Sequence, residues 1–130
     1  MNNDEIMFYE VKDTEDFDKS VTRLVRKKKF RKLPEQLEAL TNELQAGQFT
    51  GTELLVVDNP HYRVYKKRLP NIDTKSGQSN GYRIIYIVIF EQKTVGLLEI
   101  YYKKETDDLE DNYIKLLVDM FLASVLPAEE

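Results

Sequence analysis

The stretch that decides the fold is residues 82–103, with the sequence YRIIYIVIFEQKTVGLLEIYYK. Two runs of β-branched and aromatic residues, 82–90 and 95–103, flank the polar residues 91–94. Such residues favour strands, and a connection of this length is short enough for a hairpin. The sequence therefore predicts two adjacent antiparallel strands.

The segments that precede this hairpin are predicted to be a strand, two helices and another strand. Residues 62–69 are extended in character and end at a polar loop over 70–80. A first helix is expected over 15–27, where Asp13 and Thr14 offer N-cap oxygens. A second helix is expected from Pro34 to a stop at Gly47, and a short strand over 6–12.

The last predicted element is an amphipathic helix over 109–125, whose apolar stripe is expected to be core. The order is then βααβββα. This order predicts an α+β fold in which an N-terminal helical hairpin packs on a small, mainly antiparallel sheet with a C-terminal helix. We expect one domain over 1–130, with disordered tails at 1–5 and 127–130. The stripe comprises Leu109, Tyr113, Leu116, Leu117, Met120, Phe121 and Val125.

Composition excludes several classes of site. The chain has 130 residues, no cysteine and a single histidine, His61, so disulfides and thiolate metal sites are excluded. We expect no metal and no other cofactor. The longest apolar run, 84–90, is far short of a bilayer span, and residues 1–10 lack the apolar core of a signal peptide. No membrane partner is expected, and the expected location is the cytoplasm.

The net charge of −4 hides a basic middle between acidic ends. Residues 1–18 carry seven acids and one lysine, and residues 105–130 carry eight acids and one lysine. Residues 19–104 carry 17 lysines and arginines against eight acids, a local balance of +9. Such a segment suits a polyanion such as RNA, although an acidic protein would be attracted equally well.

Several of these cations fall on the predicted strands. Arg63, Tyr65 and Lys67 share one face of their strand because side chains alternate. Arg83 starts the next strand, and two lysines end the last one. If the strands are neighbours, Arg63, Lys67, Arg83 and one of the lysines are predicted to converge on one concave surface. The alternative is a solvated sheet face without a function.

Three segments resemble the RelE/ParE toxin superfamily of type II toxin–antitoxin systems, most closely its HigB-like and RelE-like branch. They are HYRVYKKR at 61–68, GYRIIY at 81–86 and LLEIYYKKE at 97–105, and the resemblance covers about residues 15–121. It implies a toxin with a cognate antitoxin protein as partner. It also implies a ribosome-dependent mRNA endonuclease, in which the ribose 2′-oxygen attacks the adjacent phosphorus. The ribosome and mRNA would then be partners as well, and the oligomeric state stays open.

The resemblance also implies roles for individual residues. Arg83 matches the arginine that binds the scissile phosphate, and its replacement by alanine is expected to leave the fold intact. Tyr113 is a weaker match to a terminal proton donor. The implied catalytic residues are Arg83, Lys67, Lys104 and Tyr113, and the implied RNA-binding residues are Arg63, Lys66, Arg68, Lys75 and Lys103.

Two positions depart from the family pattern. Tyr65 stands where RelE-type enzymes carry a basic residue, and Gln78 stands where HigB-like loops commonly carry lysine. The loss of these cations favours two alternatives to a nuclease. One is a non-catalytic, ParE-like gyrase inhibitor, and the other is a decayed RelE-fold protein-interaction module.

Overall fold

The computed structural model describes residues 8–127, which form three α-helices, a short 3-10 helix and a sheet of five strands. The predicted α+β class is confirmed. The elements in chain order are β1 (Glu10–Asp13), α1 (Glu15–Arg26), α2 (Leu33–Gln45), β2 (Thr52–Leu54), β3 (Tyr62–Leu69), η1 (Gln78–Asn80), β4 (Tyr82–Ile89), β5 (Thr94–Tyr102) and α3 (Asp111–Val125).

The predicted order βααβββα matches these elements, with one short strand, β2, added before β3. The strand expected over 6–12 is observed from Glu10 to Asp13, and positions 6 and 7 lie outside the described residues. The expected tail 1–5 and residues 128–130 of the expected tail 127–130 also lie outside them.

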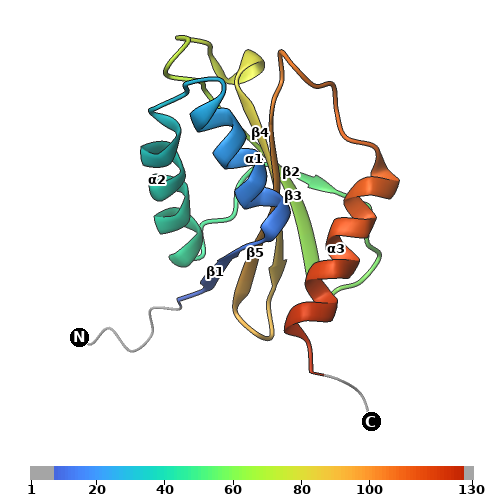
Figure 1. The fold of residues 1–130 in the computed structure, drawn as a ribbon. Helices are drawn as coiled ribbons and strands as arrows, with labels where there is room; N and C mark the ends of the chain where they lie inside the picture. Colours follow the sequence, from blue (N-terminus) through green and yellow to red (C-terminus); the bar gives the residue numbers. More distant parts are fainter. Residues whose placement is uncertain (1–7, 128–130) are drawn as a thin grey trace, which may run out of the picture.

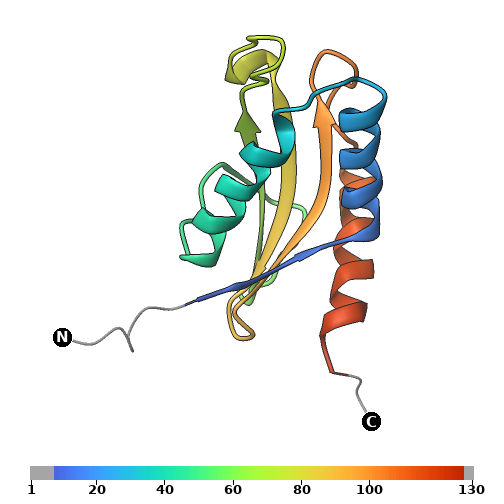
Figure 2. The same ribbon diagram turned by 60° about the vertical axis from the view of Figure 1, so that its left-hand side comes forward.

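The sheet is mixed, with the strand order β1-β5-β4-β3-β2. Neighbours are antiparallel from β2 to β5, as expected for β3, β4 and β5, whereas β1 pairs with β5 in parallel. Helices α1 and α2 lie on one side of the sheet and α3 lies on the other (Figure 1). In Figure 2, α1 and α3 overlap beside β5, and α2 lies apart from them.

Strand β4 is buried along its whole length and contributes to two cores. Its even-numbered residues from Tyr82 to Val88 pack with α1 and α2, while Ile85, Ile87 and Ile89 pack with α3. This accounts for the unbroken apolar run in the sequence, because a strand covered on both faces does not alternate with polar residues.

The start of α1 is fixed to β5 by Thr14, the predicted N-cap. Its hydroxyl accepts from the backbone N–H of Phe17 at 3.3 Å and donates to the carbonyl of Leu97 at 2.8 Å. The capped helix end is thereby tied to the strand.

Helix α3 is rotated relative to the predicted apolar stripe. Its buried residues are Ile114, Leu117, Val118 and Phe121. The stripe prediction is therefore wrong for Tyr113, Leu116 and Met120, which are 37%, 53% and 53% exposed. Close packing of Phe121 on Gly96 accompanies this orientation, since a Cβ at Gly96 would lie 2.5 Å from the Phe121 ring.

Candidate functional site

Three polar side chains form a row across the α3 side of the sheet, which we call the cross-strand row. Arg68 of β3 is paired with Arg83 of β4, and Arg83 is paired with Tyr101 of β5. Directly paired residues on neighbouring strands project to the same face. Arg68 is exposed, whereas Arg83 and Tyr101 are buried.

A one-residue shift in the β4–β5 register places Tyr101 in this row. Tyr86 pairs with Leu97 but Ile85 pairs with Glu99, so Leu98 is an extra residue in β5. The extra residue moves every later side chain of β5 to the opposite face. Without it, Arg83 would face Ile100 and not Tyr101.

The predicted convergence of Arg63 and Lys67 with Arg83 is wrong. Arg63 pairs with Val88 and Lys67 with Ile84, so both project to the α1 and α2 side of the sheet. Arg63 lies 3.9 Å from Glu53 and stacks over the Phe90 ring at 5.9 Å. The ammonium group of Lys67 donates to the hydroxyl of Thr50 at 2.6 Å. The residues of β3 that share the face of Arg83 are instead Lys66 and Arg68.

Arg83 is only 4% exposed and its guanidinium is engaged by the loop before β4. It donates to the carbonyls of Gln78 at 2.8 Å, Ser79 at 3.0 Å and Tyr82 at 3.3 Å. Arg83 is therefore not a solvent-exposed arginine, and its burial counts against the expectation that its replacement by alanine leaves the fold intact. Two of these hydrogen bonds hold the η1 turn and the third reaches the first residue of β4. No carboxylate among residues 8–127 forms an ion pair with Arg83.

Asp108, in the segment that links β5 to α3, contacts the Tyr101 end of the row. One of its oxygens, Oδ1, accepts from the hydroxyl of Tyr101 at 3.0 Å. The same oxygen lies 3.3 Å from the ammonium of Lys66 and 3.8 Å from that of Lys103. The Tyr101 hydrogen bond, with the charges of Lys66 and Lys103, lowers the pKa of Asp108. A carboxylate thus occupies the point where two cations and a hydroxyl converge.

The hydroxyl of Tyr113, the predicted proton donor, is bound to a different carboxylate. It donates to Oε2 of the buried Glu99 at 3.0 Å, and Ser20 of α1 donates to Oε1 of the same side chain. Burial and the charge of Glu99 raise the pKa of Tyr113 to about 12. Burial and the contact with Asp108 also raise the pKa of Tyr101. Both phenols therefore keep their protons at neutral pH.

The segment 103–110 is anchored at a second point. Glu105 lies 2.8 Å from Arg23 and 3.2 Å from Lys28, so α1 and the turn after it hold this carboxylate. These contacts, chiefly the Arg23 hydrogen bond, lower the pKa of Glu105. Lys104, directly before Glu105, is exposed, and Lys75 is exposed in the loop before η1. That loop and the segment 103–110 rise from the same end of the sheet (Figure 1).

A small cavity adjoins the row at the edge of β3. Its volume is about 210 Å³, and it opens beside the short strand β2. Three consecutive cations of β3 contribute to its lining, together with the loop that Arg83 holds. The lining residues are Gly51, Thr52, Lys66, Lys67, Arg68 and Gln78.

Over residues 8–127, no group of three or more potential metal-binding side chains occurs. Within the same range, no helix has the length and hydropathy needed to cross a membrane.

The solved structures that resemble this chain include two with RelE. The isolated RelE toxin of E. coli has 21% identity and a TM-score of 0.48, covering 86% of this chain and 98% of that one. The archaeal RelE–RelB complex from Pyrococcus horikoshii OT3 has 21% identity and a TM-score of 0.47, covering 77% and 100%. No family model and no curated protein matches the chain. Neither neighbour resolves the HigB-like branch.

Sequence reasoning missed Tyr101 and misjudged Asp108. The sequence places Asp108 in the acidic end over 105–130, but its carboxylate is paired with Lys66 and Lys103 of the basic middle. Its position shortly after Lys103 and Lys104 in the sequence was the available signal for a pairing with a lysine. Tyr101 had no comparable signal, because its face depends on the extra residue in β5.

Proposed function

We propose that the chain is the toxin of a type II toxin–antitoxin pair and cleaves mRNA on the ribosome. The observation that carries the proposal is the cross-strand row, which sets a fixed guanidinium between an exposed arginine and a protonated phenol. Lys66, Lys103, Lys104 and Lys75 extend the positive charge around it. A cognate antitoxin, the ribosome and mRNA are the proposed partners.

The proposed chemistry needs positive charge and a proton donor. The ribose 2′-oxygen bonds to the adjacent phosphorus as the bond to the 5′-oxygen breaks, which leaves a cyclic phosphate and a 5′-hydroxyl. Arg68 and Lys66 neutralise the charge on the non-bridging phosphate oxygens. Arg83, which is paired with Arg68, holds the backbone of the η1 turn beside them. The 2′ proton passes to solvent, and the 5′-oxygen takes a proton from a tyrosine. Tyr101 suits this donor role better than Tyr113, because it lies opposite Arg83.

A specific observation favours the non-catalytic rival. Arg83 is engaged by three carbonyls, and Lys66, Lys103 and Tyr101 share one carboxylate. A row whose donors are already satisfied is suited to holding a surface rigid for a protein partner. A ParE-like gyrase inhibitor or an interaction module would need no more than that.

Two arginines of β3 provide the test. Arg68 and Arg63 are both exposed, but they project to opposite faces of the sheet. On programmed ribosomes we expect the unaltered chain to cut mRNA, Arg68→Ala to cut about 10²-fold more slowly, and Arg63→Ala to cut at the parental rate. Equal losses in the two variants would remove the row from the mechanism.

The same assay separates the rival class. If the unaltered chain leaves mRNA intact while its expression changes DNA supercoiling, the gyrase-type function replaces the nuclease. If neither changes, the chain acts only as a binding module.

A further inference from the structure

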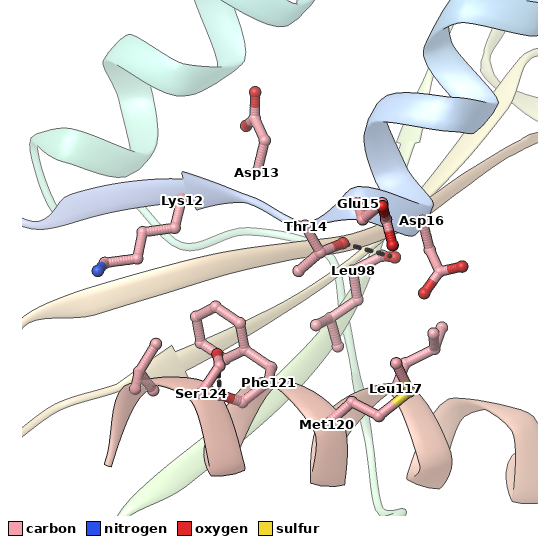
Figure 3. A pocket seen from close by; sticks show the side chains of 11 residues that line it. Lys12, Asp13, Thr14, Glu15, Asp16, Leu98, Leu117, Met120, Phe121 and Ser124 are labelled. Atoms are coloured by element: carbon pink, nitrogen blue, oxygen red, sulfur yellow. Dashed lines mark hydrogen bonds between the residues drawn. The ribbon is translucent and has the colours of Figure 1, made fainter. Parts of the chain in front are cut away.

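A groove separates α3 from the start of α1, away from the cross-strand row. Its volume is about 300 Å³. Leu98, Leu117 and Phe121 line its apolar floor, and the chain from Lys12 to Asp16 forms the opposite wall. Figure 3 shows the side chains of Phe121, Leu117 and Met120 of α3 below this wall.

Apolar surface continues from the groove onto the outer face of α3. Met120 lines the groove and is 53% exposed, and Leu116 and Tyr113 lie one and two turns before it. The spacing of these three residues places them on one stripe of the helix. Single exposed apolar residues are ordinary, but a stripe that borders an apolar groove is typical of a surface that contacts another molecule.

The wall of the groove carries uncompensated negative charge. Within residues 8–127, no cationic nitrogen lies within 4.0 Å of the carboxylates of Asp13, Glu15 or Asp16. Lys12, the cation of the wall, is 4.0 Å from Glu10. The helix dipole contributes only roughly half a positive charge at the α1 N-terminus. With Asp18 also in the first turn, the acids outweigh it.

The acids of the wall lie on both of its sides. In Figure 3, Asp16 extends on the α3 side of the chain, whereas Asp13 points away toward α2. Asp16 is also close enough to Tyr113 to act on its hydroxyl electrostatically. Negative charge therefore accompanies the apolar stripe of α3 along the groove.

We propose that this groove docks a basic, amphipathic helical segment of a protein partner. Leucine-sized side chains of that segment would enter the apolar floor beside Met120, and its lysines or arginines would pair with Glu15 and Asp16. Nucleic acid and an anionic membrane surface are disfavoured as occupants, because the wall repels phosphate. The inference does not depend on nuclease activity.

The test uses the full chain, labelled with ¹⁵N, and a designed helical peptide with leucines at i, i+3 and i+7 and arginines between them. We expect saturable shift changes at residues 12–16 and 117–125 and weaker binding as salt is raised. A peptide with glutamate in place of each arginine should not bind. Absence of saturable changes at the groove, or equal binding of both peptides, would overturn the proposal.

Two matched double variants identify the wall as the source of affinity. Glu15→Gln/Asp16→Asn should weaken binding about three- to tenfold. Glu110→Gln/Asp111→Asn removes the same charge from the start of α3 and should leave binding unchanged. Equal weakening by the two double variants would mean that the net charge of the chain, and not the wall of the groove, accounts for the affinity.

Analytical ultracentrifugation at rising protein concentration tests whether a second copy of this chain occupies the groove instead. We expect a constant mass. A mass that rises, and that Glu15→Gln/Asp16→Asn returns to the monomer value, would assign the groove to a second copy of this chain and overturn the proposal of a different partner.

Discussion

Acidic side chains occupy two regions of this molecule in opposite electrostatic states. In the segment 103–110, Glu105 and Asp108 each lie within 4.0 Å of two cationic side chains. At the start of α1, none of the carboxylates of Asp13, Glu15 and Asp16 has such a neighbour among the described residues.

This difference indicates at which of the two regions a charged partner can gain more electrostatic binding free energy. A paired carboxylate has to be displaced before its cations can bind an external anion, so Asp108 competes with RNA for Lys66 and Lys103. An unpaired carboxylate requires no such exchange. The basic middle of the sequence is therefore partly neutralised from within, while the acidic groove keeps its full attraction for a cationic segment.

The largest expected effect tests the rigid part of the paired region. Arg83→Ala removes a buried guanidinium and leaves three carbonyls without their donor. Hydrogen bonds to charged groups contribute about 1.5–3 kcal/mol each and are not additive, so we expect a loss of about 2–4 kcal/mol in the free energy of unfolding. Urea denaturation measures it. Arg68→Ala, the exposed neighbour in the row, should change it by less than about 0.5 kcal/mol.

If Arg83→Ala proves as harmless as Arg68→Ala, the η1 turn does not depend on the guanidinium. Arg83 would then be free to bind phosphate, as the family resemblance implies.

A smaller effect is expected from breaking the pairing at Asp108. Asp108→Asn keeps the shape of the side chain but releases Lys66 and Lys103. Exposed ion pairs contribute about 0.2–1 kcal/mol each, so RNA affinity should rise about two- to fivefold. Fluorescence anisotropy with a short single-stranded RNA measures this rise. Asp107→Asn removes the same charge from the adjacent exposed position and is the control; an equal rise there would attribute the gain to net charge.

The elements of the fold were largely predictable because their signals are local. Thr14 caps α1 as its position before the apolar repeat indicates, and the hairpin of β4 and β5 follows from its two apolar runs. Strand β2 gave little signal because it has only three residues. The orientation of α3 was not predictable, since the buried face depends on the fit of Phe121 against Gly96, a contact between distant positions.

The site was less predictable for the same reason. Alternation along β3 correctly groups Arg63 with Lys67, but the face that they share is set by the pairing with β4. The extra residue Leu98 then decides that Tyr101, not Ile100, faces Arg83. No local pattern marks a single inserted residue inside an apolar run, so the members of the row could be named only after the register was known.

The smallest expected effect is a difference in titration between the two acidic regions. Burial and the nearby Asp18 raise the pKa of Asp13 above its ordinary value of 3.8, whereas Tyr101 and the lysines lower that of Asp108 below the same value. Folding therefore favours the neutral form of Asp13, and this contribution to stability is lost as pH rises through its raised pKa. Folding favours the charged form of Asp108, and that contribution is lost as pH falls through its lowered pKa.

Carboxyl ¹³C chemical shifts should show Asp13 titrating above pH 3.8 and Asp108 below it. Asp18→Asn should move the Asp13 midpoint down, and Tyr101→Phe should move the Asp108 midpoint up. Coincident midpoints in the unaltered chain would mean that the two regions do not differ electrostatically in solution, and the contrast on which both binding proposals draw would be lost.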